Sequence, residues 1–169
     1  MRALIVTDRG VQDQEAMYPY YRLQEAAMLV DVATPNGEAV LGIGGTMITA
    51  TESYFGAKQK KFDLLVIPGG VKAMERMRMD EELVRYVADF HASGRPVASI
   101  CSGAQMLISA NLCRGRVICC YPAMRVDVEN AGATFHPGPA VTSDRIVTAP
   151  HYRYLGQWMA ETLRELHRA

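Results

Sequence analysis

The sequence predicts a doubly wound α/β fold, in which a mostly parallel sheet carries helices on both faces. Three observations support this. Short apolar runs of strand length recur along the chain, segments with helical periodicity separate them, and Gly/Pro turns end most of them. A chain of 169 residues without internal repeats or linkers suits one domain, residues 1–169.

The first half of the chain supplies two strands, a helix and a hairpin. Residues 3–7 form an apolar run typical of a buried parallel strand. Helix formers fill residues 13–28, where Pro19 is expected to kink the helix or delay its start. A second strand, residues 29–34, stops at a Pro-Asn-Gly turn, and residues 37–50 are rich in glycine and β-branched residues, which predicts a small hairpin.

The second half continues the alternation. A buried strand at 64–67 ends at Pro-Gly-Gly, and Asp80 is a plausible N-cap for a helix that stops at residues 94–96. Strands follow at 97–100, 117–119 and 146–148. A terminal helix is predicted from apolar residues at helical spacing, namely Leu155, Trp158, Met159, Leu163 and Leu166.

Composition excludes several classes of partner. The chain has 18 basic and 18 acidic side chains and no basic cluster, so we expect neither nucleic acid nor a membrane surface as a partner. No apolar run could span a bilayer, and the N-terminus reads as a strand, not a signal peptide. The four cysteines show no metal-ligand spacing, so we expect free thiols, a cytoplasmic location and no metal.

The segment PVASICSGAQMLI, residues 96–108, is typical of a nucleophile elbow. A strand meets a turn of small residues, and a helix follows at once, which places Cys101 at a strained tip with Ser99 and Gly103 as its small neighbours. Amides at the helix start favour a thiolate and can bind an oxyanion, so we expect a low-pKa nucleophile. A buried structural cysteine is the alternative.

Three strand ends converge in such a sheet. Ligands bind beyond the carboxyl ends of the strands, and residues 8–15, Gly69-Gly70 and Cys101 each follow a predicted strand. We therefore expect one crevice that contains a thiol, a double glycine and a polar loop.

The chain resembles the ThiJ/PfpI superfamily, and within it the PfpI-like branch. The motifs are YPYYRL (18–23), DLLVIPGG (63–70), the elbow, GRVICCYPAMRVDVENAGA (115–133) and IVTAPHYRYLGQW (146–158). The resemblance implies a flavodoxin-like sandwich of the class I glutamine amidotransferase type, a small-molecule substrate, no cofactor, and assembly into dimers, often hexamers.

The resemblance also implies site residues. Cys101 matches the nucleophile, and the amides of Gly70 and Ser102 match the oxyanion donors. Glu75 matches a glutamate that a neighbouring subunit contributes, and its Met-rich flanks suit a subunit contact, although a solvated helix face is equally consistent.

Two positions depart from the PfpI pattern. Ser102 stands where a histidine usually follows the nucleophile, and register from the N-terminus places Gln12 at the first-loop acid, with Glu15 further into the helix. If Gln12 occupies the acid site, no carboxyl lies beside the sulfur and glyoxalase-type activity is expected to be very weak. Ser102 also resembles the threonine of the isonitrile hydratase branch.

Three further side chains are candidates for the site. His151 follows a strand end and could form a Cys–His pair, or it is a surface histidine. Tyr121 resembles a family feature at the mouth of the site, or it serves packing. Cys120 could act as a resolving thiol, or it is buried and inert.

These observations favour an enzyme that adds the Cys101 thiolate to a small carbon electrophile, as a hydrolase or hydratase. Isonitrile hydration is an alternative. A non-enzymatic redox or stress protein with an oxidisable Cys101, and a scaffold with a vestigial site, are the others.

Overall fold

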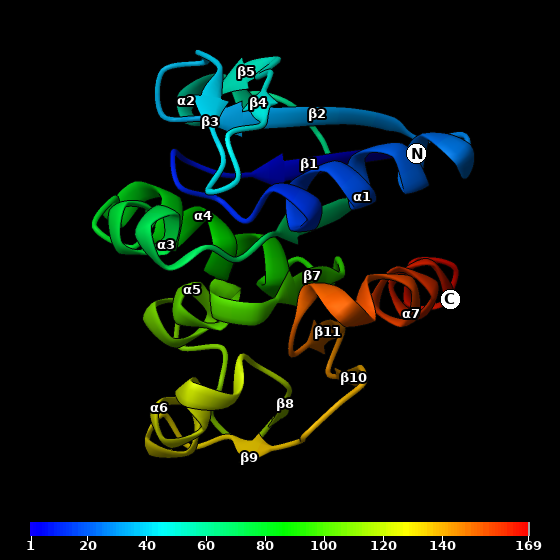
Figure 1. Cartoon of the computed structure of the whole chain (residues 1–169). Helices are drawn as coiled ribbons and strands as arrows, with labels where there is room; N and C mark the ends of the chain where they lie inside the picture. The colour runs from blue at the N-terminus through cyan, green and yellow to red at the C-terminus, as the bar shows by residue number, and fades with distance from the viewer. Residues whose placement is uncertain (169) are drawn as a thin grey trace.

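A seven-stranded sheet forms the centre of the computed structural model, which describes residues 1–168 (Figure 1). Its strand order is β10-β11-β7-β6-β1-β2-β5, and only β10 runs antiparallel to its neighbour. The strands are β1 (Arg2–Val6), β2 (Leu29–Thr34), β5 (Glu52–Ser53), β6 (Leu64–Ile67), β7 (Val97–Ile100), β10 (Val141–Ser143) and β11 (Ile146–Ala149). The five central parallel strands have the flavodoxin-like order 2-1-3-4-5, which confirms the predicted fold class.

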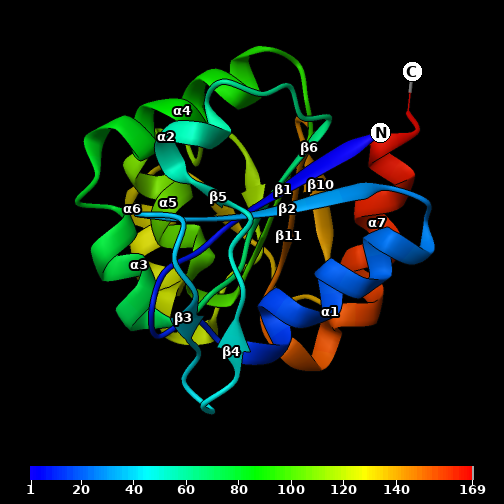
Figure 2. The same cartoon turned by 90° about the horizontal axis from the view of Figure 1, so that it is seen from above.

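Helices cover both faces of this sheet (Figures 1 and 2). On one face lie α1 (Asp13–Glu25) and α7 (Leu155–Leu166), which contact each other. On the other lie α3 (Val71–Met77), α4 (Glu81–Ala92) and α5 (Ala104–Ser109). The remaining short helices are α2 (Tyr54–Ala57), α6 (Arg125–Asn130), η1 (Cys101–Gly103), η2 (Pro122–Met124) and η3 (Tyr152–Tyr154).

Two small sheets lie outside the central one. The predicted hairpin is confirmed as β3 (Val40–Leu41) and β4 (Met47–Ile48), which pair antiparallel. The strand predicted at 117–119 is β8 (Val117–Ile118), but it pairs with β9 (Thr134–Phe135) and does not extend the main sheet.

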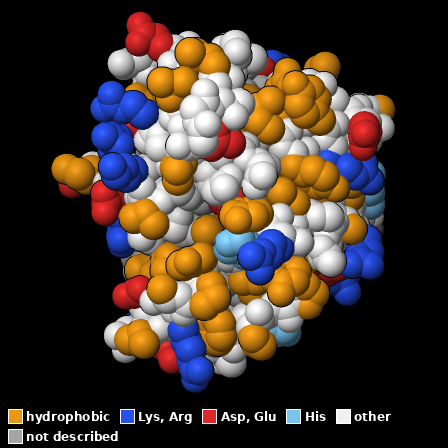
Figure 3. Space-filling view, viewed as in Figure 1, with side chains coloured by type: hydrophobic (Ala, Val, Ile, Leu, Met, Phe, Trp, Pro, Cys, Tyr) orange, Lys and Arg blue, Asp and Glu red, His pale blue; other side chains and the backbone are white. Residues whose placement is uncertain are grey.

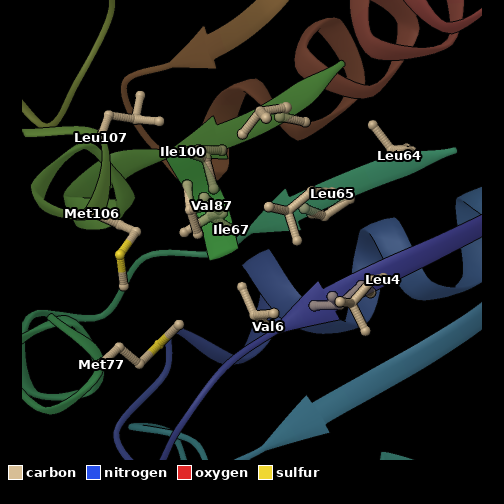
Figure 4. Close-up of a cluster of buried hydrophobic side chains, with 14 of the residues drawn as sticks. Leu4, Val6, Leu64, Leu65, Ile67, Met77, Val87, Ile100, Met106 and Leu107 are labelled. Carbon is tan, nitrogen blue, oxygen red and sulfur yellow. The ribbon is translucent and has the colours of Figure 1, made fainter. Parts of the chain in front are cut away.

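The core fills both sides of the central strands, because each residue of β6 and β7 is buried. Figure 4 shows Leu65, Ile67 and Ile100 of these strands with Met77 and Met106 of the covering helices. Burial of each such side chain contributes about 1.5–3 kcal/mol, so the three strands β1, β6 and β7 form a rigid base for the loops that follow them.

The helix predicted over residues 13–28 begins where expected and ends earlier, at Glu25. α1 begins at Asp13 and continues through Pro19, so a late start caused by that proline is wrong. Pro19 lies buried inside the helix, where it lacks the N–H that would donate to the carbonyl four residues earlier. The unbroken start matters, because it sets which side chains of the first turn face the sheet.

No helix within the described residues 1–168 has the length and apolar character needed to cross a membrane.

Candidate active site

Cys101 lies at a strained turn between β7 and α5. Its φ is 58°, in the left-handed region that costs a non-glycine residue about 1–3 kcal/mol. Gly103 is required two residues later, since a Cβ there would lie 2.6 Å from Ser99 Oγ and 2.7 Å from the Ile67 carbonyl oxygen. The elbow expected from the sequence is therefore present in its geometry.

Glu15 approaches Cys101 from α1. Its side chain is fully buried, and the Gly69 N–H donates to Glu15 Oε2 at 2.8 Å. A Cβ on Gly69 would lie 2.5 Å from that oxygen and 2.8 Å from Cys101 Cβ. The Glu15 carboxyl and the Cys101 side chain thus pack against Gly69 from two sides. Only glycine at this position leaves room for them to contact each other.

Burial makes Glu15 a weak acid. Removal from water raises its pKa to about 7, although the Gly69 amide, the Cys101 thiol and the Tyr152 amide each favour the charged form. Glu15 Oε1 has no hydrogen-bond partner of ordinary geometry among residues 1–168, so one oxygen is anchored and the other remains available. A carboxyl with this pKa can accept or donate a proton near neutral pH.

The expected low pKa of Cys101 is wrong. Burial and the negative charge of Glu15 raise the pKa of the thiol to about 12, whereas the backbone and side chain of Ser102 lower it. The helix start favours the thiolate, but burial and the neighbouring Glu15 carboxylate disfavour it more strongly. The position at a helix start therefore does not decide the ionisation of Cys101. Burial thus favours the protonated form of both groups, and the Glu15 carboxyl releases its proton more readily than the Cys101 thiol does.

Glu15→Gln is expected to lower the pKa of Cys101, because it removes the negative charge that opposes the thiolate. Thiolate absorbance measured against pH should give a wild-type midpoint above the value of about 8.5 for a free cysteine, and a lower midpoint in the variant. Cys101→Ser supplies the background of the other thiols. Equal midpoints in the wild type and the variant would show that the carboxyl does not act on the thiol.

Ser102 fills the position beside the sulfur. It is buried, and its Oγ accepts a hydrogen bond from the Gly70 N–H at 2.8 Å. Gly70 itself has φ 105°, and a Cβ there would lie 2.4 Å from the Gly10 carbonyl oxygen. Because the Gly70 amide is already paired, its use as an oxyanion donor requires the Ser102 hydroxyl to rotate away. That role of Gly70 stays a prediction.

Gln12 does not occupy the position beside the sulfur. Its side chain caps α1, where Gln12 Oε1 accepts from the Gln14 N–H at 2.8 Å. Glu15, three residues further and nearly one helical turn on, points its carboxyl at the elbow. The inference that no carboxyl lies beside the thiol is therefore wrong, and with it the basis for expecting very weak glyoxalase-type activity.

The structure places two aromatic side chains near the elbow. The Tyr121 N–H donates to the Cys101 carbonyl at 3.2 Å, and the Tyr121 and His151 rings stack with centroids 6.1 Å apart. His151 Nδ1 accepts from the Arg153 N–H at 3.3 Å, so this histidine caps η3. Burial and the Arg153 charge lower its pKa, which keeps the ring neutral at neutral pH.

The other candidates lie apart from this contact. Glu75 is exposed on α3, and its role across a subunit interface stays a prediction. Cys120 is fully buried, and burial raises its pKa to about 12. Both facts disfavour a reactive second thiol.

Sequence reasoning placed Gly69 in the expected crevice without giving it a role, and it did not identify Tyr152 or Arg153 as site residues. The double glycine after β6 was a usable signal for Gly69, because a glycine that adjoins a strand end often permits close approach of another group. No local pattern marks Tyr152 or Arg153. Within residues 1–168 no group of three or more His, Cys, Asp or Glu side chains is arranged to hold a metal ion.

The profile of the DJ-1/PfpI family matches residues 1–165. The chain belongs to the DJ-1/PfpI family. The relatives of this DJ-1/PfpI chain include "Deglycase PfpI" of Pyrococcus furiosus, 33% identical over 166 residues that cover 98% of this chain and 99% of the relative. "Protein/nucleic acid deglycase 2" of Escherichia coli is 33% identical over 97% and 96% of the two chains. Enzymes thus occur among the relatives by name.

Solved structures of the family share this fold. A two-domain protein from Anabaena variabilis with DJ-1/ThiJ/PfpI-like and ferritin-like domains has a TM-score of 0.93 at 29% identity. The match covers 98% of this chain but spans about half, 48%, of that chain. Schizosaccharomyces pombe DJ-1 has a TM-score of 0.89 at 18% identity, over 99% of this chain and 93% of that one, which shows the fold alone.

Proposed function

We propose that this chain is a cysteine-dependent deglycase, a hydrolase that removes carbonyl-derived adducts from amines or thiols. The contact between Glu15 and Cys101 carries the proposal, because it places a base with a pKa of about 7 beside a thiol at a nucleophile elbow. Relatives that match nearly the whole chain bear the name deglycase, which supports the same reaction class.

The pair performs the reaction as follows. Glu15 first transfers the proton of the adduct's carbinol hydroxyl to the departing amine or thiol, which breaks the bond to that group and leaves an aldehyde in the site. Glu15 then takes the proton from the Cys101 thiol while the sulfur adds to the aldehyde carbon, so no free thiolate has to accumulate. The electron pair of the carbonyl moves to its oxygen, which needs a hydrogen-bond donor, and we assign this role to the Ser102 N–H, which already interacts with the Cys101 sulfur. Glu15 then moves the proton of that carbon to the neighbouring carbonyl carbon, which converts the hemithioacetal into a thioester. Water cleaves the C–S bond of the thioester, which releases a hydroxy acid and restores the Cys101 thiol.

The test uses the adduct of methylglyoxal with a simple amine. Wild-type protein should remove the adduct faster than it dissociates spontaneously, and Cys101→Ala should abolish this removal. Cys113→Ala is the matched control, since it deletes a buried thiol from another part of the fold and should leave turnover intact. Removal that never exceeds the spontaneous dissociation rate would mean that the protein acts on free methylglyoxal only, and would refute the deglycase assignment.

A second candidate is addition of water to an isonitrile. The buried Ser102 hydroxyl beside the sulfur favours it, because a hydroxyl-bearing residue follows the cysteine in the branch that the elbow resembles. Formation of an N-substituted formamide that depends on Cys101 would select this reaction. The redox alternative has less support, since oxidation follows thiolate character and the pKa of Cys101 is raised.

A further inference from the structure

A groove of about 540 Å³ is lined by the turns that follow β8 and β11. Prolines and aromatic rings form most of its wall, and Tyr121, His151 and Arg153 belong to it. Backbone contacts tie both sides of the groove to the reacting pair. The Tyr121 N–H donates to the Cys101 carbonyl, and the Tyr152 amide, between His151 and Arg153 in the chain, acts on the Glu15 carboxyl.

The charge in this groove has one sign. Its wall contains no acidic residue, and Arg153 is its charged side chain. Arg153 is exposed and, like Arg9, Arg76, Arg78, Arg85, Arg95 and Arg114, forms no ion pair with any carboxylate of residues 1–168. Among these arginines it alone belongs to the wall of this groove. An unpaired guanidinium on an apolar wall is a suitable partner for an anion.

His151 supplies a second donor. Because its Nδ1 accepts from the Arg153 N–H, the neutral ring carries its proton on Nε2. A neutral imidazole N–H and one guanidinium together complement a single negative charge, and the Tyr121 ring stacks on the imidazole. Figure 3 shows a histidine and a Lys or Arg side chain together in the middle of the drawn face, bordered by hydrophobic side chains.

We propose that this groove binds the carboxylate of the electrophile, with Arg153 as the residue that selects electrophiles carrying both a carbonyl group and a carboxylate over uncharged carbonyl compounds. This inference rests on the proposed function, because it names the substrate class of the Cys101 site. The carboxylate lies against Arg153 and His151, and the carbonyl carbon one or two bonds away faces the sulfur.

The test compares two alkylating agents of nearly equal size, iodoacetate with a carboxylate and iodoacetamide without one. The rate ratio of iodoacetate to iodoacetamide at Cys101, followed by mass spectrometry of its peptide, cancels the ionisation of the thiol. Arg153→Gln should lower this ratio about fivefold, the size of one charge contact at close range in water, and added salt should lower it in the wild type.

Arg164→Gln is the matched control, because it also removes one exposed arginine charge but lies on α7, paired with Glu161. It should leave both rates and their ratio unchanged. A ratio unaffected by Arg153→Gln, or lowered equally by Arg164→Gln, would overturn the proposal. The readout requires no turnover, so a wild type that removes no adduct would refute the deglycase function while the ratio still decides on Arg153.

A second measurement uses turnover. The kcat/KM for the amine adduct of 2,3-dioxopropanoate, in which a carboxylate replaces the methyl group of methylglyoxal, divided by that for the methylglyoxal adduct, should also fall about fivefold in Arg153→Gln. If this quotient does not change, Arg153 does not select the carboxylate.

Discussion

Glu15→Gln is expected to lower kcat/KM for adduct removal by about 10²–10⁴-fold, the usual contribution of a positioned general base. Gln keeps the size of the side chain and can still accept from the Gly69 N–H, but it cannot take the Cys101 proton. The wild-type rate should rise with pH and level off above about 7, where Glu15 is ionised. This inflection should be absent in the variant.

Glu25→Gln is the matched control, because Glu25 lies exposed at the other end of the same helix. Glu15→Gln combines two opposite changes. Its Cys101 thiol ionises more readily, and yet the enzyme turns over more slowly. A Glu15→Gln enzyme with wild-type kcat/KM would show that another residue accepts the proton, and His151 would be the next to test.

Gln12→Glu should not raise turnover by the factor that a new base brings, because Gln12 caps the helix away from the sulfur.

Glu15→Gln is also expected to stabilise the fold at neutral and higher pH. Below the ordinary pKa of 4.5 the carboxyl is protonated in the folded and unfolded states alike, so it has no effect there. As pH rises from 4.5 to about 7, the unfolded chain releases this proton and the folded protein retains it, which lowers the free energy of unfolding. The loss amounts to about 3 kcal/mol and is complete above the folded-state pKa.

Glu15→Gln removes this loss, so urea unfolding at about pH 8 should show a gain of up to about 3 kcal/mol over the wild type. The gain should vanish at about pH 4, where both proteins carry an uncharged side chain. A variant less stable than the wild type at the higher pH would mean that the ionised carboxylate is held favourably, contrary to the effect of its burial. Taken with the kinetic result, a gain here would show that the site retains a destabilising group because the chemistry needs it.

The sequence by itself determined the fold class and the place of the nucleophile. Strands of four to six residues, Gly/Pro turns and amphipathic helices are set by near neighbours in the chain, so β6, β7 and α4 lie within a residue or so of their predicted bounds. The elbow was predictable for the same reason, since small residues on both sides of Cys101 report a local steric need.

Only the tertiary structure decided which groups surround the thiol. Glu15 and Gly69 are 54 residues apart and meet through the order of β1, β6 and β7, and counting along the chain favoured Gln12 because both residues lie within the first turn of one helix. The ionisation of Cys101 likewise depends on burial and on a carboxylate from another element, neither of which a helix start reveals. The same holds for the groove, whose wall combines turns around residues 121 and 151 that sequence patterns leave unrelated.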